Sequence, residues 1–253
     1  MKINNNNFSA IIIFSLLSVL FVLLIWCSFK WSSFSQNVNI SSIKITGSKL
    51  IPVEEYHKLF DSFTGISSFS TDVRKISTRI EKHSHVSSAR VSRMLPKGLL
   101  IEITERQPIA MVNATPPMLL DRHGILFPLR GSFSDYTLPV LSHFVSTENS
   151  YHEINKIQSK TMAAAKQILQ VLEEEHPRLF ENISELRLNN HEDFEIILLE
   201  QPTKVVLGKN QHIKKINILM NFENQLQLLN KNITDYKKLD LRYDSQVVAQ
   251  EWT

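Results

Sequence analysis

FSAIIIFSLLSVLFVLLIWCSF, residues 8–29, is an unbroken apolar run close to the start of the chain. It contains no charged residue, and Lys30 ends it. About 20 consecutive apolar residues are enough for a helix to cross the hydrocarbon core of a bilayer. The 253-residue sequence has no second run of this kind. It therefore predicts a single membrane-spanning helix that holds one large body at a membrane face.

Two other interpretations of residues 8–29, a cleaved signal peptide and a lipoprotein signal, fit the residues less well. A signal peptide has an apolar region of about 7–15 residues followed by a cleavage site of small residues, whereas Trp26, Lys30 and Trp31 lie at the end of this run. A lipoprotein signal would have a small residue before Cys27, where Trp26 stands. Both tryptophans suit the aromatic belt at a membrane–water interface. We therefore predict an uncleaved anchor.

The charges beside the anchor do not set its orientation. Lys2 and the α-amine precede it, and Lys30, Lys44 and Lys49 follow it. The positive-inside rule compares lysine and arginine close to the membrane, and here it gives no support to a cytoplasmic N-terminus. Long domains are translocated largely regardless of charge. At this point both orientations stay open.

The composition argues against several classes of partner and fold. The 28 basic and 25 acidic residues are interspersed, with a net charge of +3 and no basic block, which argues against a nucleic-acid partner. Cys27 is the only cysteine and lies inside the anchor, so the body can form no disulfide. This fits a bacterial periplasm or a cytoplasm, and argues against a small disulfide-stapled extracellular module.

No motif predicts an active site, a metal site or a cofactor site. The glycines form neither a dinucleotide-binding nor a phosphate-binding loop, and the serines lie in no nucleophile elbow. His83 and His85 could supply two metal ligands, but a site needs three or four, so a charged loop is the better interpretation. We therefore expect no catalytic residue, no metal, no cofactor and no small-molecule substrate.

Residues 40–108 are predicted to form a compact α+β unit, after a Ser/Asn-rich linker over residues 30–39. Apolar and polar residues alternate before Gly47, as in a half-buried strand, and two amphipathic helices and two further strands follow. This order places helices on one face of a small sheet. The predicted elements are a strand at 42–46, helices at 52–63 and from Val73 to Ile80, and strands at 86–91 and 99–105.

Gln107-Pro108 marks the boundary to a second unit of mixed sheet and helices, over residues 109–253. A hairpin is predicted to turn at residues 122–124, and a long helix over residues 154–175 to stop at Pro177. The remaining elements are an extended piece at 138–141, strands at 184–188, 194–199 and 204–208, a helix at 213–229, and two final strands, KLDLRY (238–243) and QVVAQEW (246–252).

Three strings, in this order after a single anchor, resemble the FtsQ/DivIB family of bacterial cell-division proteins. They are VSRMLPKGLLIEITERQPIA (91–110), LLDRHGILF (119–127) followed by LPVL, and LDLRYDS (239–245). The strings IKITGSKLIP and VVLGK also match, so the resemblance covers nearly the whole chain. It implies that residues 40–108 form a POTRA domain and residues 109–253 the β domain of this family. The signature residues of the POTRA domain would be Gly47, Arg93, Pro96, Glu105 and Arg106.

The resemblance also implies a function and a location. Family members are non-enzymatic scaffolds of the divisome that recruit FtsB, and with it FtsL, and help to control septal peptidoglycan synthesis. By analogy, residues 1–7 would be a cytoplasmic tail and residues 8–29 a single type II span of the inner membrane. The body would lie in the periplasm, enriched at the division septum.

The resemblance places the FtsB contact at the end of the chain. By position, Arg242, Tyr243, Ser245, Val247 and Trp252 would form the binding edge. A terminal strand with an open edge can accept a partner's strand, and Tyr, Trp and Arg are frequent interface anchors. The competing interpretation is a half-buried strand whose polar face meets water.

Three positions depart from the family pattern. Gln246 stands where a glycine is usual, and the spacing from Tyr243 to Trp252 is one residue longer, so the register of the last strand would be affected. Some relatives carry an arginine just before the aromatic residue that opens the 194–199 strand, where this chain has Asn190-His191-Glu192-Asp193-Phe194. If His191 replaces that arginine, its pairing with an acidic partner would be weaker and pH-sensitive.

Two other functions fit the sequence less well. A POTRA protein of outer-membrane assembly or secretion would need a β-barrel or tandem POTRA repeats, and neither pattern follows residue 110. A membrane-anchored cell-wall hydrolase would need a nucleophile or a metal constellation, and the sequence shows no such motif.

Overall fold

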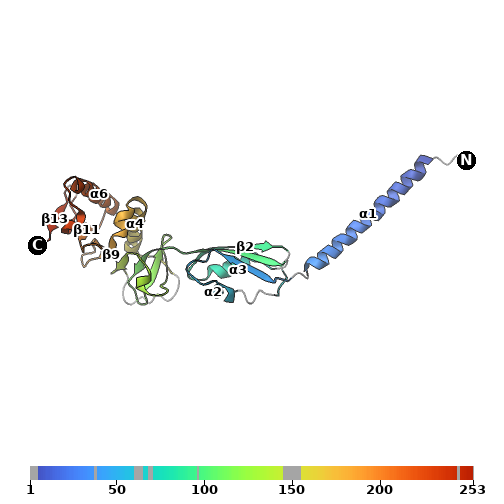
Figure 1. Ribbon diagram of the computed structural model, residues 1–253, viewed down its shortest axis with the longest axis horizontal. Coiled ribbons are helices and arrows are strands. Elements are labelled where there is room, and N and C mark those ends of the chain that lie inside the picture. Colours follow the sequence, from blue (N-terminus) through green and yellow to red (C-terminus); the bar gives the residue numbers. More distant parts are fainter. Residues whose placement is uncertain are drawn as a thin grey trace. The chain divides into compact units, whose positions relative to one another are not determined.

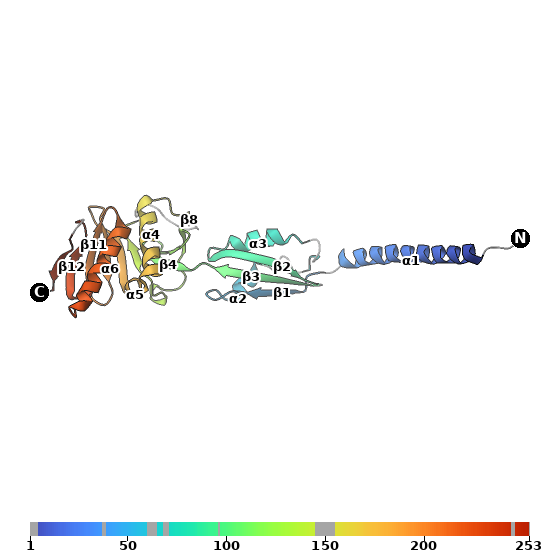
Figure 2. The ribbon, with the colours of Figure 1, turned by 90° about the horizontal axis from the view of Figure 1, so that it is seen from above.

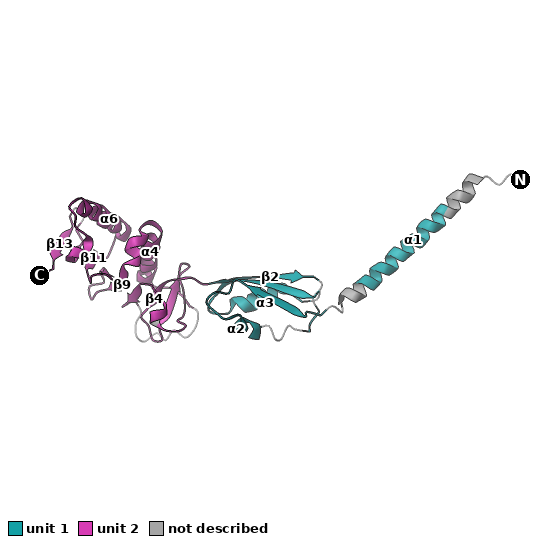
Figure 3. Ribbon diagram, viewed as in Figure 1, with its two compact units in different colours: residues 1–105 teal, residues 106–253 magenta. Residues whose placement is uncertain are grey.

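The computed structural model describes residues 5–36, 39–59, 65–67, 71–95, 97–144, 155–243 and 246–252. The chain divides into two compact units, residues 1–105 and 106–253 (Figure 3). The predicted boundary after Pro108 lies slightly too late. Pro108 begins strand β4 (Pro108–Val112) and pairs with Asp121, so it belongs to the second unit. A proline is tolerated there because the first residue of a strand need not donate to the ladder.

Helix α1 (Asn5–Gln36) contains the predicted anchor. Its segment Ile13–Trp31 is long and apolar enough to cross a membrane, and none of it is buried against the rest of the protein. The helix does not end at Phe29. The predicted linker over residues 30–39 is helical as far as Gln36, because the residues from Lys30 to Gln36 include neither glycine nor proline to interrupt it.

The rest of the first unit is a small sheet covered by helices, as the sequence predicted. Its elements are β1 (Ser42–Thr46), α2 (Val53–Lys58), α3 (Val73–Glu81), β2 (Val86–Met94) and β3 (Gly98–Glu105). The strand order is β1-β3-β2, with β1 parallel and β2 antiparallel to β3 (Figure 2). Helix α3 lies beside β2 (Figure 1). Helix α3 begins where the Asp72 side chain accepts a hydrogen bond from the Arg74 N–H, 3.0 Å long, and buries Ile76 and Ile80 against the sheet.

The second unit is a long mixed sheet, as predicted. Its first elements are β4, β5 (Met118–Asp121), β6 (Ile125–Pro128), the 3-10 turn η2 (Phe133–Asp135), β7 (Val140–Ser142), β8 (Asn155–Lys156), α4 (Lys160–Glu175) and α5 (Pro177–Glu181). They are followed by β9 (Ile183–Leu188), β10 (Phe194–Leu198), β11 (Lys204–Gly208), α6 (His212–Leu228), η3 (Ile233–Asp235), β12 (Tyr236–Asp240) and β13 (Val248–Glu251).

The described strands of this unit lie in the order β13-β12-β11-β10-β9-β7-β4-β5-β6-β8. The pairs β4/β7, β7/β9 and β11/β12 are parallel, and the others are antiparallel. Helices α4 and α6 cover one face of the sheet (Figure 2), where Ile168, Leu172 and Leu219 join the main core. A smaller cluster around Met111, Leu119 and Phe127 forms separately. In the strand order given above, β13 and β8 are the two end strands of the sheet.

The helix predicted over residues 154–175 begins later than expected. Residue 154 lies outside the described residues, Asn155 and Lys156 pair with β6, and α4 begins at Lys160. The Ser159 hydroxyl accepts from the Met162 N–H and caps the helix. The helix ends just before Pro177, as predicted. Pro177 is then the first residue of α5, where its missing N–H costs nothing.

The strand predicted over residues 238–243 ends at Asp240. Leu241 N–H still donates to the Val206 carbonyl, 2.9 Å away, but the Arg242 N–H donates to the Asp240 side chain at 3.2 Å. The Asp240 carboxylate thus accepts from the backbone N–H of Arg242 in place of a neighbouring strand, and the chain turns out of the sheet here. Arg242 and Tyr243 follow the strand and do not belong to it.

Candidate functional site

The C-terminal strand β13 is an edge strand of the second unit. It pairs antiparallel with β12, with Asp240 opposite Val248 and Leu239 opposite Ala249. Its four residues are all exposed. Among the described residues no strand pairs with its other side, so β13 presents a row of unpaired backbone groups to a partner strand.

Arg242 lies at the start of this edge and contacts two buried carboxylates. Its Nε is 2.9 Å from Asp240 Oδ1, and its Nη2 is 2.7 Å from Asp240 Oδ2. Its Nη1 lies 3.3 Å from Asp193 Oδ2. Lys238 Nζ adds a second cation, 3.1 Å from Asp240. The guanidinium is half-exposed, while both aspartates are buried. This cluster fixes the turn that leads from β12 toward β13.

The pKa of the Asp240 carboxyl reflects this cluster. Burial by itself raises the pKa, but the hydrogen bonds from Arg242 and Lys238 outweigh burial and hold the pKa at about 2, below its ordinary 3.8. The same contacts raise the pKa of the Arg242 guanidinium. Asp240 therefore stays ionised at any physiological pH, and the turn does not switch with protonation.

Tyr243 and Trp252 lie at opposite ends of β13. Tyr243 follows the Arg242 turn, whereas Trp252 follows the last residue of the strand. Both side chains are exposed, and the Trp252 indole N–H donates to the Thr234 carbonyl at 3.1 Å. A strand rises about 3.3 Å per residue, so the four residues of β13 extend over about 13 Å of the edge. The predicted residues therefore flank one edge instead of forming one cluster.

Two other predicted contacts differ in their surroundings. Val247 is half-buried and packs against the main core, so its side chain holds the start of β13 against the sheet and is not free for a partner. Val248, which the sequence did not single out, is exposed on the strand itself. Ser245 lies outside the described residues.

His191 belongs to the turn between β9 and β10. The Asn189 side-chain oxygen accepts from the His191 N–H at 2.8 Å and from the Asp193 N–H at 3.0 Å. Asp193 in turn contacts Arg242, so the turn and the C-terminal edge meet at one end of the sheet. His191 is exposed and borders a depression of about 280 Å³, together with Arg187, Glu195 and Lys204.

The sequence pattern does not mark Asp193 as a site residue and does not reveal the role of Asp240. Their positions beside strand ends are visible in the sequence, but 47 residues separate them, from 193 to 240. They meet because β10 begins and β12 ends at the same end of the sheet, on either side of β11. Their proximity depends on the order of the strands in the sheet, and a single sequence does not reveal that order.

We expect replacement of Arg242 by glutamine to raise the pKa of Asp240 from about 2 toward 3.8. Because the folded-state pKa lies below the unfolded one, ionised Asp240 stabilises the fold above pH ~4, and this contribution disappears as the pH falls through about 2. Since Arg242 is half-exposed, the variant should cost only about 1 kcal/mol at neutral pH. NMR titration of the carboxyl carbons measures the shift.

The matched control is Arg90→Gln, because Arg90 is an exposed arginine whose Nε lies 3.8 Å from an exposed carboxylate of Glu102. It should leave both the stability and the titration of Asp240 unchanged. An Asp240 pKa that stays near 2 in Arg242→Gln would show that Lys238 and the backbone N–H of residue 242, and not the guanidinium, hold it low.

In the first unit, the predicted signature residues Gly47 and Glu105 lie where the loop after β1 approaches β3. Gly47 has φ +88°, and a Cβ at this position would lie 2.0 Å from the Ile103 carbonyl oxygen. The Glu105 carboxylate accepts hydrogen bonds from the backbone N–H groups of Lys49, Leu50 and Ile51 at 2.9, 2.7 and 3.1 Å. It also accepts from the buried Tyr56 hydroxyl at 3.1 Å. These contacts hold the loop after β1 in place.

The other signature residues have different surroundings. The Arg93 guanidinium donates to the Thr71 carbonyl at 2.6 Å and ties the start of α3 to β2. Arg106 is part of the second unit, where its Nη1 lies 2.8 Å from the buried Asp121 carboxylate. Asp121 also accepts from the N–H groups of His123 and Ile125, which closes the predicted hairpin. Pro96 lies outside the described residues.

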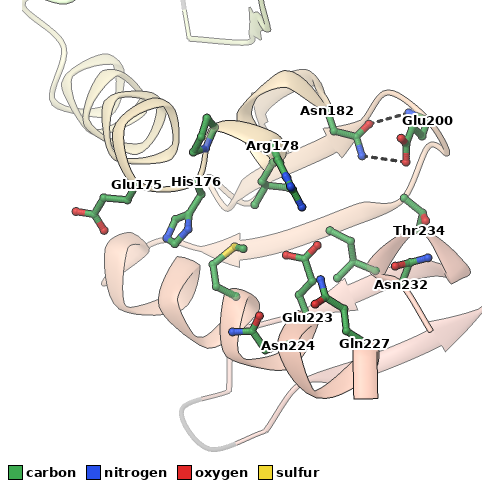
Figure 4. Close-up of a pocket in the computed structure, with 14 residues that line it drawn as sticks. Glu175, His176, Arg178, Asn182, Glu200, Glu223, Asn224, Gln227, Asn232 and Thr234 are labelled. Atoms are coloured by element: carbon green, nitrogen blue, oxygen red, sulfur yellow. Dashed lines mark hydrogen bonds between the residues drawn. The ribbon is translucent and has the colours of Figure 1, made fainter. Parts of the chain in front are cut away.

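A polar groove of about 680 Å³ lies between α5, α6 and η3 (Figure 4). Burial raises the pKa of the Glu223 carboxyl, against the opposing charges of His176 and Arg178. Asn182 is already committed to Glu200, whose backbone N–H and carboxylate it contacts at 2.9 and 3.4 Å. No serine or cysteine is among the lining residues described, and no group of three or more ligating side chains in the described ranges could hold a metal ion. The groove can bind polar groups.

The two units match two family models. Residues 38–106 match the POTRA domain of the FtsQ type, and residues 107–250 match the model described as FtsQ/DivIB, C-terminal related. The junction of the two matches lies one residue from the division between the compact units. One match therefore covers the part of the first unit that follows α1, and the other covers nearly all of the second unit.

The chain is also similar to curated proteins named cell division protein FtsQ. The one from Syntrophotalea carbinolica is 28% identical over 76% of this chain and 68% of its own length. The one from Geotalea daltonii is 25% identical over 84% of this chain and 75% of its own length. A third, from Koribacter versatilis, is 23% identical over 82% of this chain and 58% of its own length. With a family model matching more than half of its residues, the chain belongs to the FtsQ/DivIB family of cell-division proteins.

Proposed function

We propose that this protein is a non-enzymatic divisome scaffold that recruits FtsB, and with it FtsL, by adding a partner strand to the free edge of β13. The observation that carries the proposal is the exposed end strand itself, flanked by Tyr243 and Trp252. In β-augmentation the backbone hydrogen bonds supply affinity, and side chains beside the edge supply specificity. The two aromatic side chains are the anchors in this proposal.

Arg242 has a different role in this proposal from the one expected from sequence. Its guanidinium already contacts Asp240 and Asp193, so it acts chiefly by holding the turn that positions Tyr243. Its half-exposed side chain leaves room for a further carboxylate from the partner. His191, exposed on the neighbouring turn, would be the second basic group at this end of the edge.

In the same proposal, α1 spans the inner membrane as a single type II anchor. Residues 1–7 lie in the cytoplasm and both folded units in the periplasm, enriched at the septum. The apolar segment Ile13–Trp31 supports membrane anchoring, and the family membership supports the division machinery as the setting. By holding FtsB and FtsL there, the protein would help to control septal peptidoglycan synthesis.

The test is calorimetric binding of the full chain, reconstituted in nanodiscs, to the periplasmic segment of FtsB from the same organism. We expect Tyr243→Ala and Trp252→Ala each to weaken binding by about 2 kcal/mol, roughly 30-fold in Kd, because buried aromatic anchors dominate interface energies. The Trp252→Phe variant, which keeps most of the apolar area but loses the indole N–H, should lose less.

The matched control is Leu228→Ala. Leu228 is a large apolar residue, 84% exposed, on α6 and not on β13, so its removal should leave the affinity unchanged. Equal affinities for the wild type and both aromatic variants would place the interface elsewhere. Failure of the folded wild type to bind would contradict the proposal as a whole.

A further inference from the structure

The turn between β2 and β3 exposes large apolar side chains at one end of the first unit. Leu95 is 63% exposed, and Met94 beside it and Ile66 nearby are also exposed. Lys97 follows in the same turn, and its ammonium makes no hydrogen bond or ion pair within the described ranges. We call Ile66, Met94, Leu95 and Lys97 the hairpin tip. Exposed apolar residues that gather with a cation mark a surface made for contact.

The hairpin tip lies where the folded unit meets the membrane anchor. The Ser41 N–H donates to the Lys97 carbonyl at 2.9 Å, and the Ile40 N–H donates to the Ile66 carbonyl at 2.9 Å. The first residue of β1, Ser42, pairs with Gly98 at the start of β3. Figure 2 shows that β2 ends where β1 and β3 begin. Residues 40–42 therefore connect both parts of the tip to the chain that leaves α1.

The length of that chain limits how far the tip can be from the bilayer. Helix α1 ends at Gln36, and Asn39 is the next described residue. Three Cα–Cα steps of 3.8 Å span at most about 11 Å, whatever the conformation of residues 37 and 38. The helical residues after Trp31, the end of the apolar segment, rise about 8 Å. That is close to the depth of about 5–7 Å of one polar headgroup layer.

We propose that the hairpin tip docks on the bilayer surface, with Leu95 and Met94 in the boundary between headgroups and acyl chains and Lys97 among lipid phosphates. Apolar side chains gain by leaving water there, and a lysine can extend its ammonium to the phosphates while its stem stays in apolar surroundings. Arg93 and Arg74 are further exposed cations close to this end, and Asp72 is the opposing acid. Docking would give the first unit a fixed orientation on the membrane.

The experiment measures the depth of residue 95 in the full chain reconstituted into vesicles that contain 30% anionic lipid. In a Cys27→Ser background, Leu95→Cys carries an environment-sensitive fluorophore, and lipids with a spin label on the shallow acyl carbons act as quenchers. The matched control is Leu50→Cys. Leu50 is comparably exposed at 54% and follows β1 beside Glu105, at the opposite end of the same sheet.

We expect the quenchers to reduce the emission at residue 95 at least threefold and to leave residue 50 nearly unchanged. A label on the native Cys27, inside the apolar segment, should be quenched as well. Equal, weak quenching at residues 95 and 50 would overturn the proposal and leave a protein partner as the occupant of the tip. Absence of quenching at residue 27 would overturn it too, because the tip reaches the bilayer only through an inserted α1. Neither outcome depends on FtsB, so the role of β13 is tested separately.

Discussion

Replacing Gly47 by alanine is expected to lower the free energy of unfolding of the first unit by about 4 kcal/mol, the sum of backbone strain and a forced shift in the sheet. Gly47 has φ +88°, a region that L-residues with a side chain rarely adopt. The new Cβ would lie 2.0 Å from the Ile103 carbonyl oxygen and 3.1 Å from its carbon. Ile103 is on β3, the central strand, so the clash can be relieved only by moving backbone that pairs with both neighbours.

The control for this variant is Gly65→Ala. Gly65 has nearly the same conformation, φ +85°, but nothing lies within 4 Å of its added Cβ. It should cost about 1–2 kcal/mol from the backbone term alone. Native-state hydrogen exchange of the β3 amides in the full chain measures both values. Equal losses in the two variants would contradict the close approach of Gly47 to β3.

Replacing Glu105 by alanine is expected to destabilise the first unit by about 3 kcal/mol, because it leaves buried or half-buried donors without an acceptor. Its carboxylate accepts from the N–H groups of Lys49, Leu50 and Ile51 and from the Tyr56 hydroxyl. Glu102→Ala, on the same strand, removes an exposed carboxylate whose partner Arg90 is 3.8 Å away. It should change stability by less than about 0.5 kcal/mol, and a similar cost for both variants would contradict the assignment.

Stability of the first unit should also depend on pH through Glu105. Burial raises the pKa of this carboxyl, but the three backbone N–H donors and Tyr56 together outweigh burial and leave the pKa below its ordinary value of 4.5. The stabilisation is therefore complete above that value and is lost as the pH falls through the lowered pKa. The Glu105→Ala variant should show a flatter acid dependence than the wild type when hydrogen exchange is measured from pH 7 downward.

Local patterns in the sequence predicted most of the fold. The alternation of Ile43 and Ile45, the helical spacing of Ile76 and Ile80, and the turn glycine Gly124 each reflect short-range geometry. The structure confirms the strand–helix–helix–strand–strand order and the mixed sheet that follows. The predicted bounds were wrong where a specific contact overrode a local preference. Helix α4 begins later than predicted because Ser159 caps it and because β8 pairs with β6. Strand β12 ends earlier than predicted because the Asp240 side chain accepts from the Arg242 N–H.

The site was only partly visible in the sequence because it depends on strand order. Tyr243 and Trp252 are close in sequence, yet they lie at the two ends of β13. Asp193 and Asp240 are far apart in sequence, yet both contact Arg242. Among the described strands β13 lies at the end of the sheet, which leaves one of its sides open. Periodicity alone does not reveal which strand lies at the edge.

The measurement that tests the role of β13 most directly is hydrogen exchange of its own backbone amides in the full chain in nanodiscs, with and without the periplasmic segment of FtsB. If the partner adds a strand to the free edge, the outward-facing amides of Val248–Glu251 gain acceptors. We expect their exchange to slow at least tenfold on binding, while the exposed end of α6 near Leu228 stays unchanged. Binding that leaves all four β13 amides exchanging at their original rates would contradict strand addition at this edge.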